Sequence, residues 1–165
     1  MNFEILDHRH GLRSVSTAER MGVENLLEKI AYPDGALSSK EVLEPIKEGL
    51  TVLGWSGKVA IGQGTNISIN GVHADVGMAI QLGNVSRIYA DLMKFQALYF
   101  EEKIASGIII VPHKDMVTRL SKSGGTDNRC TFNRLARELP IFSKVITMPI
   151  LVYGIYTKEV EDAEQ

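Results

Sequence analysis

The sequence holds a single cysteine, Cys130, among 165 residues. One cysteine excludes an internal disulfide framework and any zinc site built from several cysteines. Because Cys130 has no obvious catalytic partner, we interpret it as a small buried residue rather than a nucleophile. No apolar run reaches the roughly 18 residues that suggest a membrane span. Residues 1–14 also lack the long apolar stretch of a signal peptide, so we expect a cytoplasmic protein.

The chain has no large excess of charge of either sign, since its net charge is −2. The charges are unevenly distributed, however. Residues 87–144 hold ten basic against six acidic side chains, whereas residues 1–58 hold seven against nine. A basic middle in a nearly neutral protein favours a binding face for an anion such as nucleic acid. The length and the apolar fraction of 44% predict one soluble globular domain over 1–165.

Hydrophobic periodicity and capping residues predict the first elements, which are a short strand over 3–6, a helix opened by Ser16 and a helix from about Ser38 to Gly54. Ser16 and Glu19 have the spacing of a capping box, in which the two side chains satisfy each other's free amides. In the second helix, Pro45 is expected in or just after the first turn, where proline is tolerated.

From residue 58 the apolar pattern alternates, which predicts a β-meander up to residue 82. A helix capped by Ser86 then separates this meander from a buried strand over 107–112, and we expect the two flanking strands to be parallel. The remaining expected elements are a polar loop over 121–129, a short helix around 132–139, a strand over 145–155 and a frayed tail over 155–165. This order predicts a single-domain α/β fold with a central mixed sheet flanked by helices.

A combined pattern of short segments follows the same order along the chain. It consists of Asn70, AIQLGN at 79–84, YADLMKF at 89–95, GIIIVP at 107–112 and ITMPI at 146–150. This pattern resembles the BglII-type restriction endonucleases, within the PD-(D/E)XK nuclease superfamily, and the resemblance runs from about Trp55 to Ile155. It implies a restriction-endonuclease-like fold and a homodimer on double-stranded DNA. It also implies Mg²⁺-dependent hydrolysis of phosphodiester bonds.

The resemblance implies a metal site with an Asp on one strand and a Glu on the next, because a hard cation takes oxygen ligands. This sequence has Asn70 at the Asp position and Ala79, nine residues later, at the Glu position. Gln81 matches a polar residue that helps to position the attacking water. Glu48 loosely matches an acidic residue that some relatives bring near the metal, and a solvated helix residue is the alternative. Both substitutions affect the metal site, so we expect weak or absent Mg²⁺ binding and impaired catalysis.

Two hairpins are compatible with the residues around Asn70. If Asn70 lies beside Ala79, the turn is centred on Ala74 and Asp75. The alternative is a turn at Asn70–Gly71, a strong hairpin dipeptide that would separate Asn70 from Ala79. We favour the first, because the spacing implied by the resemblance requires it. Asp75 is then a turn residue and does not replace the missing acid.

Base reading is expected from side chains that fork onto base edges in the major groove, chiefly Arg and Asn. The polar loop and its approach supply the candidates Arg119, Ser121, Lys122, Ser123, Asn128 and Arg129. Arg87 and Lys114 are candidates for phosphate contacts. A solvated loop without DNA contacts is the alternative interpretation.

Three hypotheses for the function follow. The first is a type II restriction endonuclease that binds a specific duplex sequence and is impaired by Asn70 and Ala79. The second is a non-cleaving DNA-binding homologue, or a partner subunit of an active nuclease. The third is an unrelated α/β structural or small-molecule protein. Metal-dependent cleavage of DNA distinguishes the first from the second, and DNA binding distinguishes both from the third.

Overall fold

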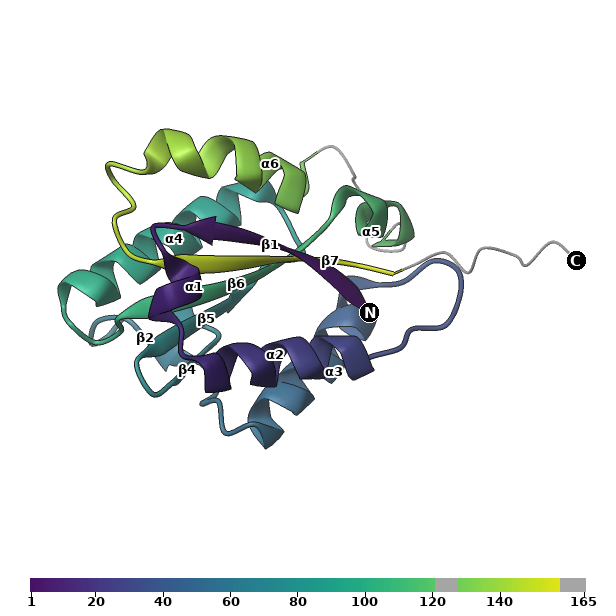
Figure 1. Ribbon diagram of the computed structural model, residues 1–165, viewed down its shortest axis with the longest axis horizontal. Coiled ribbons are helices and arrows are strands. Elements are labelled where there is room, and N and C mark those ends of the chain that lie inside the picture. Colours follow the sequence, from purple (N-terminus) through teal and green to yellow (C-terminus); the bar gives the residue numbers. More distant parts are fainter. Residues whose placement is uncertain (121–127, 158–165) are drawn as a thin grey trace, which may run out of the picture.

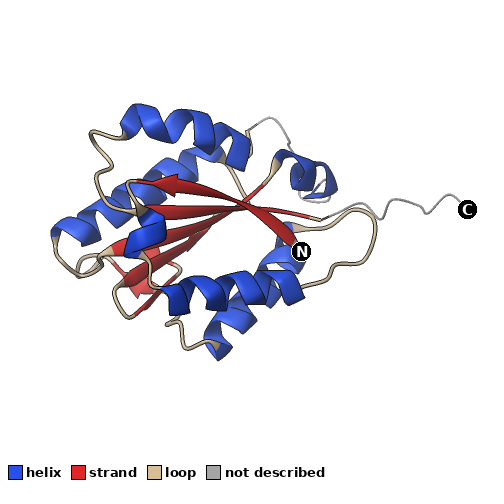
Figure 2. Cartoon of the chain, viewed as in Figure 1, coloured by secondary structure: helices blue, strands red, loops and turns tan. Residues whose placement is uncertain are grey.

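A five-stranded sheet forms the middle layer of the protein, and helices cover both of its faces (Figures 1 and 2). The computed structural model describes residues 1–120 and 128–157. This arrangement confirms the predicted single-domain α/β fold with a central mixed sheet. Within the described residues, no helix combines the length and the apolar character that a membrane crossing requires.

The strands of the central sheet lie in the order β1 (Asn2–His8), β7 (Ile150–Tyr156), β6 (Ser106–Pro112), β5 (Val76–Ile80) and β4 (Gly71–His73). β5, β6 and β7 are mutually parallel, whereas the edge strands β1 and β4 are antiparallel to their neighbours. Every residue of β6 is buried, because both faces of the sheet are covered. The predicted N-terminal strand is confirmed and pairs with the last strand of the chain.

β4 and β5 form the hairpin that decides between the two predicted turns. The strands pair antiparallel with His73 opposite Val76, so the turn lies at Ala74 and Asp75. Ala74 takes a left-handed conformation, with a φ angle of 49°. The turn at Ala74–Asp75 is therefore confirmed, and the alternative at Asn70–Gly71 is wrong. The pairing of β5 with the buried strand β6 overrides the local turn preference of the Asn-Gly dipeptide.

A small second sheet, made of β2 (Val59–Ala60) and β3 (Ser68–Ile69), precedes the hairpin. Asn70 is the single residue between β3 and β4, so the chain enters the main sheet at this position. The Asn70 amide donates to the Met78 carbonyl at 3.0 Å. Met78 is also the residue that lies opposite Gly71 in the β4–β5 register, so Asn70 and Gly71 share this partner on β5. Asn70 therefore lies beside the end of β5, where its backbone N–H donates to the Met78 carbonyl and its side chain accepts from the Ile80 N–H.

One face of the sheet carries α2 (Thr17–Lys29) and α3 (Ser39–Val52), which follow the single turn α1 (Gly11–Ser14) (Figure 1). Ser38 and Glu41 form a complete capping box on α3. At α2 the Ser16 hydroxyl accepts from the Glu19 amide at 3.3 Å, but the Glu19 carboxylate lies 3.3 Å from His73. The position predicted for Pro45 is wrong, because the Ser38 cap starts the helix early and leaves Pro45 in its second turn.

The opposite face carries α4 (Val85–Phe100), α6 (Phe132–Glu138) and the 3₁₀ turn η2 (Leu139–Phe142), whereas α5 (Lys114–Arg119) packs with the first layer. α4 links β5 to the parallel strand β6, which confirms the predicted parallel pair. Its N-cap is Asn84 rather than the predicted Ser86, since the Asn84 side chain accepts from the Ser86 amide at 2.8 Å.

The last strand is shorter than predicted and begins at Ile150 instead of Val145. The amides of Val145 and Ile146 both donate to the Phe142 carbonyl at 2.8 Å, so these residues extend the η2 turn. The predicted tail lies outside the described residues from position 158 onward.

Alternate residues of β5 point to opposite layers of the protein. Met78 and Ile80 belong to the buried cluster that includes α2 and α3, whereas Ala79 belongs to the cluster formed with α4 and α6. Where β5 ends, the chain therefore carries side chains toward both helical layers. The candidate site lies at this end of β5.

Candidate active site

A cleft with a volume of about 530 Å³ lies between α3 and α4, where β5 ends. Its lining residues are Ser39, Lys40 and Leu43 of α3, Lys58, residues 68–70, residues 80–83, and Arg87, Asp91 and Lys94 of α4. Asn70 and Gln81, two of the predicted site residues, both line this cleft. The sheet supplies its floor and one helix from each layer supplies each wall.

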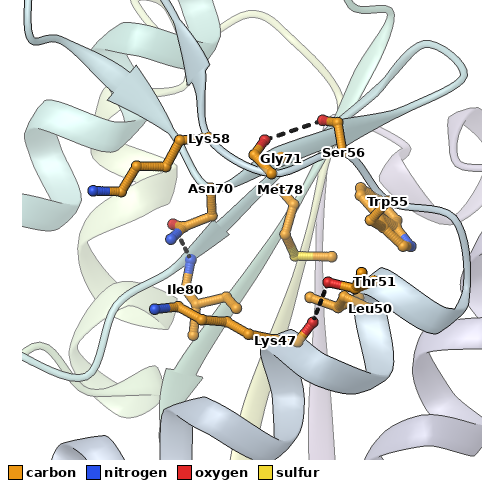
Figure 3. Close-up of a pocket in the computed structure, with 11 residues that line it drawn as sticks. Lys47, Leu50, Thr51, Trp55, Ser56, Lys58, Asn70, Gly71, Met78 and Ile80 are labelled. Carbon is orange, nitrogen blue, oxygen red and sulfur yellow. Dashed lines mark hydrogen bonds between the residues drawn. The ribbon is translucent and has the colours of Figure 1, made fainter.

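The Asn70 side chain is held at the cleft by a hydrogen bond to the backbone of β5. Its amide oxygen accepts from the Ile80 N–H at 2.9 Å (Figure 3). Because a backbone N–H only donates, this contact fixes the orientation of the amide. The oxygen is occupied by Ile80, and the amide nitrogen is the group left for the cleft.

Ala79 ends in a methyl group that is fully buried. It packs in the cluster that contains Ile88 and Leu92 of α4. Ala79 therefore presents no polar atom to the cleft at the position where the resemblance implies a glutamate.

Gln81 continues the chain beyond β5, and both ends of its amide have partners. Its oxygen accepts from the Gly83 N–H at 3.1 Å, and its nitrogen donates to Asp91 at 3.1 Å. The other Asp91 oxygen accepts from Lys94 at 2.8 Å. The Asp91 carboxylate, with 10% of its side chain exposed, is thus engaged on both oxygens.

A smaller cavity, with a volume of about 210 Å³, adjoins the cleft and shares Lys58, Asn70 and Ile80 with it. Figure 3 shows Trp55 at one end of this cavity. The ammonium groups of Lys47 and Lys58 lie at the other end, on the side of Asn70 (Figure 3). Positive charge therefore flanks Asn70 from α3 and from the loop that follows it.

The residues of the cleft do not fit the Mg²⁺ ion that the resemblance implies. A magnesium site needs one or two carboxylates with free oxygens. Asn70 and Ala79 carry no negative charge, and Asp91 is already bound by Gln81 and Lys94. Throughout residues 1–120 and 128–157, no three His, Cys, Asp or Glu side chains are grouped to hold a metal ion.

Glu48 is exposed on α3 and lines neither cavity, whereas Lys47 beside it lines the smaller one. The structure thus brings Asn70, Ala79 and Gln81 together around the end of β5 and leaves Glu48 outside this group. The catalytic role of Glu48 stays a prediction.

Two arginines predicted to read bases bind the protein itself. Arg129 is buried, and its guanidinium donates to the carbonyls of Leu82 at 2.8 Å and Leu120 at 3.1 Å. Arg119 donates to the carbonyls of Pro33 and Gly35 and to the Thr157 hydroxyl. These contacts indicate a structural role for both side chains, and a base contact by either stays a prediction.

The C-terminal part of the predicted polar loop runs beside the cleft. The Val85 amide donates to the Asn128 carbonyl at 2.7 Å, and the Cys130 amide donates to the Gly83 carbonyl at 2.9 Å. Asn128 is exposed at this position. The predicted DNA-contact residues Ser121, Lys122 and Ser123 lie outside the described residues.

Arg87 and Lys114, the predicted phosphate contacts, are both exposed. Arg87 lines the cleft from the first turn of α4. Lys114 opens α5 just beyond β6, so it lies at the same end of the parallel strands as Gln81. Both side chains are thus accessible at the end of the sheet that carries the cleft.

Sequence reasoning missed Asp91 and Lys94, which lie within the YADLMKF segment. The spacing of Arg87, Asp91 and Lys94, four and then three residues, puts all three on one helix face and was a signal that could have found them. Lys40 and Lys58 had no such local signal, because the tertiary fold alone brings α3 and the following loop to the cleft.

Cys130 is not part of the site chemistry. It is buried, and its burial raises the pKa of the thiol to about 12. The thiolate, which is the nucleophilic form, is therefore scarce near neutral pH. This agrees with the prediction of a small buried residue.

Comparisons with known proteins bear on the family and the fold. The family described as restriction endonuclease BglII/BglIII matches residues 3–155. Among solved structures, the chain is similar to the crystal structure of restriction endonuclease BglII complexed with a DNA 16-mer. The TM-score is 0.83 at 15% sequence identity, and the match covers 97% of this chain and 78% of that chain. At this identity the likeness shows a common fold. The comparison with curated protein sequences found no match.

Proposed function

Because the chain belongs to the restriction endonuclease BglII/BglIII family, we propose that it binds a specific sequence in duplex DNA and is catalytically impaired as it stands. The observation that carries this proposal is the position of Asn70, which lines a cleft with basic side chains and is hydrogen-bonded to Met78 and Ile80, the two neighbours of Ala79 on β5. Asn70 and Ala79 lie where the resemblance implies acidic metal ligands. The similar solved structure, restriction endonuclease BglII, is itself complexed with DNA.

In this proposal the cleft receives the DNA backbone, and its basic side chains attract the phosphates. Arg87 and Lys114, at the same end of the sheet, fix the register of the duplex through phosphate contacts. Asn128 reads bases from the segment beside the cleft. Hydrolysis requires a group that accepts a proton from the attacking water. The cleft offers the amides of Asn70 and Gln81 there, Ala79 is buried, and Asp91 is bound to Lys94.

The alternative is a non-cleaving DNA-binding homologue or a partner subunit of an active nuclease. Both alternatives predict duplex binding, and they differ in what restores cleavage. If the chain is an impaired endonuclease, two carboxylates at positions 70 and 79 are sufficient to restore cleavage. If it is a partner subunit, cleavage appears only when a second, active chain is added.

The test is the double variant Asn70→Asp with Ala79→Glu. Asn70→Asp keeps an oxygen for the Ile80 N–H and replaces the nitrogen in the cleft by a second carboxylate oxygen. Ala79→Glu adds a carboxylate on the strand face that Gln81 shares. We expect cleavage of a DNA panel with Mg²⁺ and none with a chelator. Each single variant should cleave much less, because one carboxylate holds the ion poorly.

The matched control is Asn70→Asp with Ala79→Gln, which has the same side-chain length at position 79 without the charge. Circular dichroism and duplex binding check that each variant folds, since Ala79 is fully buried. A double variant that folds and binds DNA yet never cuts would show that the site is mapped wrongly. Efficient cleavage by the unmodified chain would direct attention to Glu48 and Asp75 instead.

A homodimer is part of the proposal, and exposed apolar side chains support it. Ile141 and Val145 are 75% and 56% exposed, beside Phe142, whose ring lies 5.7 Å from that of Tyr89 on α4. Met93, one turn further along α4, is 57% exposed. Ile141→Asp should convert a dimer to a monomer in sedimentation analysis.

Because the proposed substrate is intracellular DNA, we propose that the protein acts in the cytoplasm.

A further inference from the structure

Three basic side chains of the cleft have no acidic partner among the described residues. Lys40 of α3, Lys58 of the following loop and Arg87 of α4 are all exposed and line the cleft. No salt bridge forms at any of them within residues 1–120 and 128–157, whereas the fourth cation, Lys94, is paired with Asp91. Among the residues that the structure describes, the cleft therefore carries three positive charges without an acidic partner, and its one carboxylate, Asp91, is paired with Lys94.

The Asn70 amide adds a hydrogen-bond donor to this environment. Its oxygen is taken by the Ile80 N–H, so its nitrogen is the group available to a molecule in the cleft. An amide N–H₂ donates to an anionic oxygen and offers no lone pair to a cation. The Asn70 amide, at the position where the resemblance implies an acidic metal ligand, thus favours an anion over a cation.

We propose that Lys40, Lys58 and Arg87, with the Asn70 amide nitrogen, bind phosphates of duplex DNA directly and without a divalent cation. This inference rests on the proposed function, which is duplex binding, and adds how the charge of the phosphate is met. In a site with two carboxylates, a metal ion is needed to offset the repulsion between those carboxylates and the phosphate. Here that repulsion is absent, and the three side chains supply the positive charge themselves.

The proposal predicts the sign of the Mg²⁺ effect. Mg²⁺ has no ligand set in this cleft, so its main effect is to compete with the basic side chains for the DNA phosphates. Adding Mg²⁺ should therefore weaken binding by the unmodified chain. In the double variant Asn70→Asp with Ala79→Glu, two carboxylates repel the phosphate, so binding in a chelator should fall and Mg²⁺ should restore it.

The experiment measures binding of a labelled mixed-sequence duplex by fluorescence anisotropy, with a chelator or with Mg²⁺, over a range of salt concentrations. Three phosphate contacts give a slope of about −2.7 in log affinity against log salt, or a loss of about 40-fold from about 50 to about 200 mM. Lys58→Ala should reduce this slope by about 0.9 and weaken binding several-fold. The matched control is Lys29→Ala, an exposed lysine at the end of α2 that lines neither cavity.

Binding in a chelator that is weakened several-fold in Lys58→Ala and unchanged in Lys29→Ala would support the proposal. Binding that requires Mg²⁺, or equal losses in the two lysine variants, would overturn it while leaving the proposed function intact. Absence of duplex binding at low salt under every condition would overturn the proposed function as well. Melting temperatures of the variants distinguish a lost contact from a lost fold.

Discussion

Replacement of Arg129 by alanine tests whether this residue supports the fold or reads DNA bases. Arg129 is 7% exposed, and its guanidinium donates to two carbonyls, those of Leu82 and Leu120, and to the Ser39 hydroxyl at 3.4 Å. These contacts join the end of β5, α5 and the start of α3. A base-reading arginine would instead leave its guanidinium exposed to the groove.

The expected loss of stability follows from the groups that Arg129 leaves behind. Leu82 and Leu120 are both buried, so their carbonyls lose a charged donor with little access to water. An unsatisfied buried polar group costs about 1–3 kcal/mol, and partial entry of water reduces the sum for two carbonyls to about 2–4 kcal/mol. For a domain of this size, that corresponds to a fall in melting temperature on the order of 10 °C.

The assay combines urea unfolding with duplex binding, measured well below the melting temperature of the variant. Arg137→Ala is the matched control, because Arg137 is an exposed arginine on α6 and surface substitutions change stability by about 0.5 kcal/mol or less. Arg129→Lys should be intermediate, since one ammonium group does not span both carbonyls. The structural role would be refuted by two results together. The free energy of unfolding of Arg129→Ala would fall by less than about 1 kcal/mol, and its binding to one preferred duplex would weaken about tenfold or more relative to random DNA.

Two further predictions concern DNA binding and pH. Lys114→Ala should weaken binding to preferred and random duplexes to the same extent and lower the salt slope by about 0.9. A binding assay that finds a selective loss for one sequence would contradict a phosphate contact. Burial lowers the pKa of His8 below its usual 6.5, so the neutral ring, whose Nε2–H donates to the Ile146 carbonyl at 2.8 Å, is the folded form. The unfolded chain then binds the proton more readily, so stability should fall as pH drops below about 6.5. The urea midpoint of the unmodified chain should fall with pH, and that of His8→Gln should fall less. If both midpoints fall equally with pH, His8 is excluded as the cause.

Much of the fold could be predicted because its signals are local. The apolar run of β6 and the periodicity of α4 are visible without any long-range contact, and together they gave the parallel pair β5 and β6. The misplaced features depended on competition between neighbouring signals. Ser38 began α3 early enough to leave Pro45 in its second turn, and Asn84 caps α4 two residues before Ser86.

The positions of Asn70, Ala79 and Gln81 were predicted from the resemblance, and the hairpin register agrees with the spacing that it implies. The partners of these residues were not predictable in the same way. Asp91 meets Gln81 only because α4 packs against the face of β5 that carries Ala79. Arg129 was predicted from its polar surroundings to face DNA, but burial between Leu82 and Leu120 depends on the path of the chain in three dimensions.

The sequence by itself determined the α/β class, the order of the main elements and the residue types at positions 70 and 79, neither of which is a carboxylate. These properties depend on residue type and on short-range periodicity, which a linear chain carries fully. Only the tertiary structure decided the charge of the cleft, because Lys40, Lys58 and Arg87 come from three separate segments. It also decided which polar groups remain available, since the hydrogen bond from Ile80 takes the oxygen of Asn70 and leaves its nitrogen for the cleft.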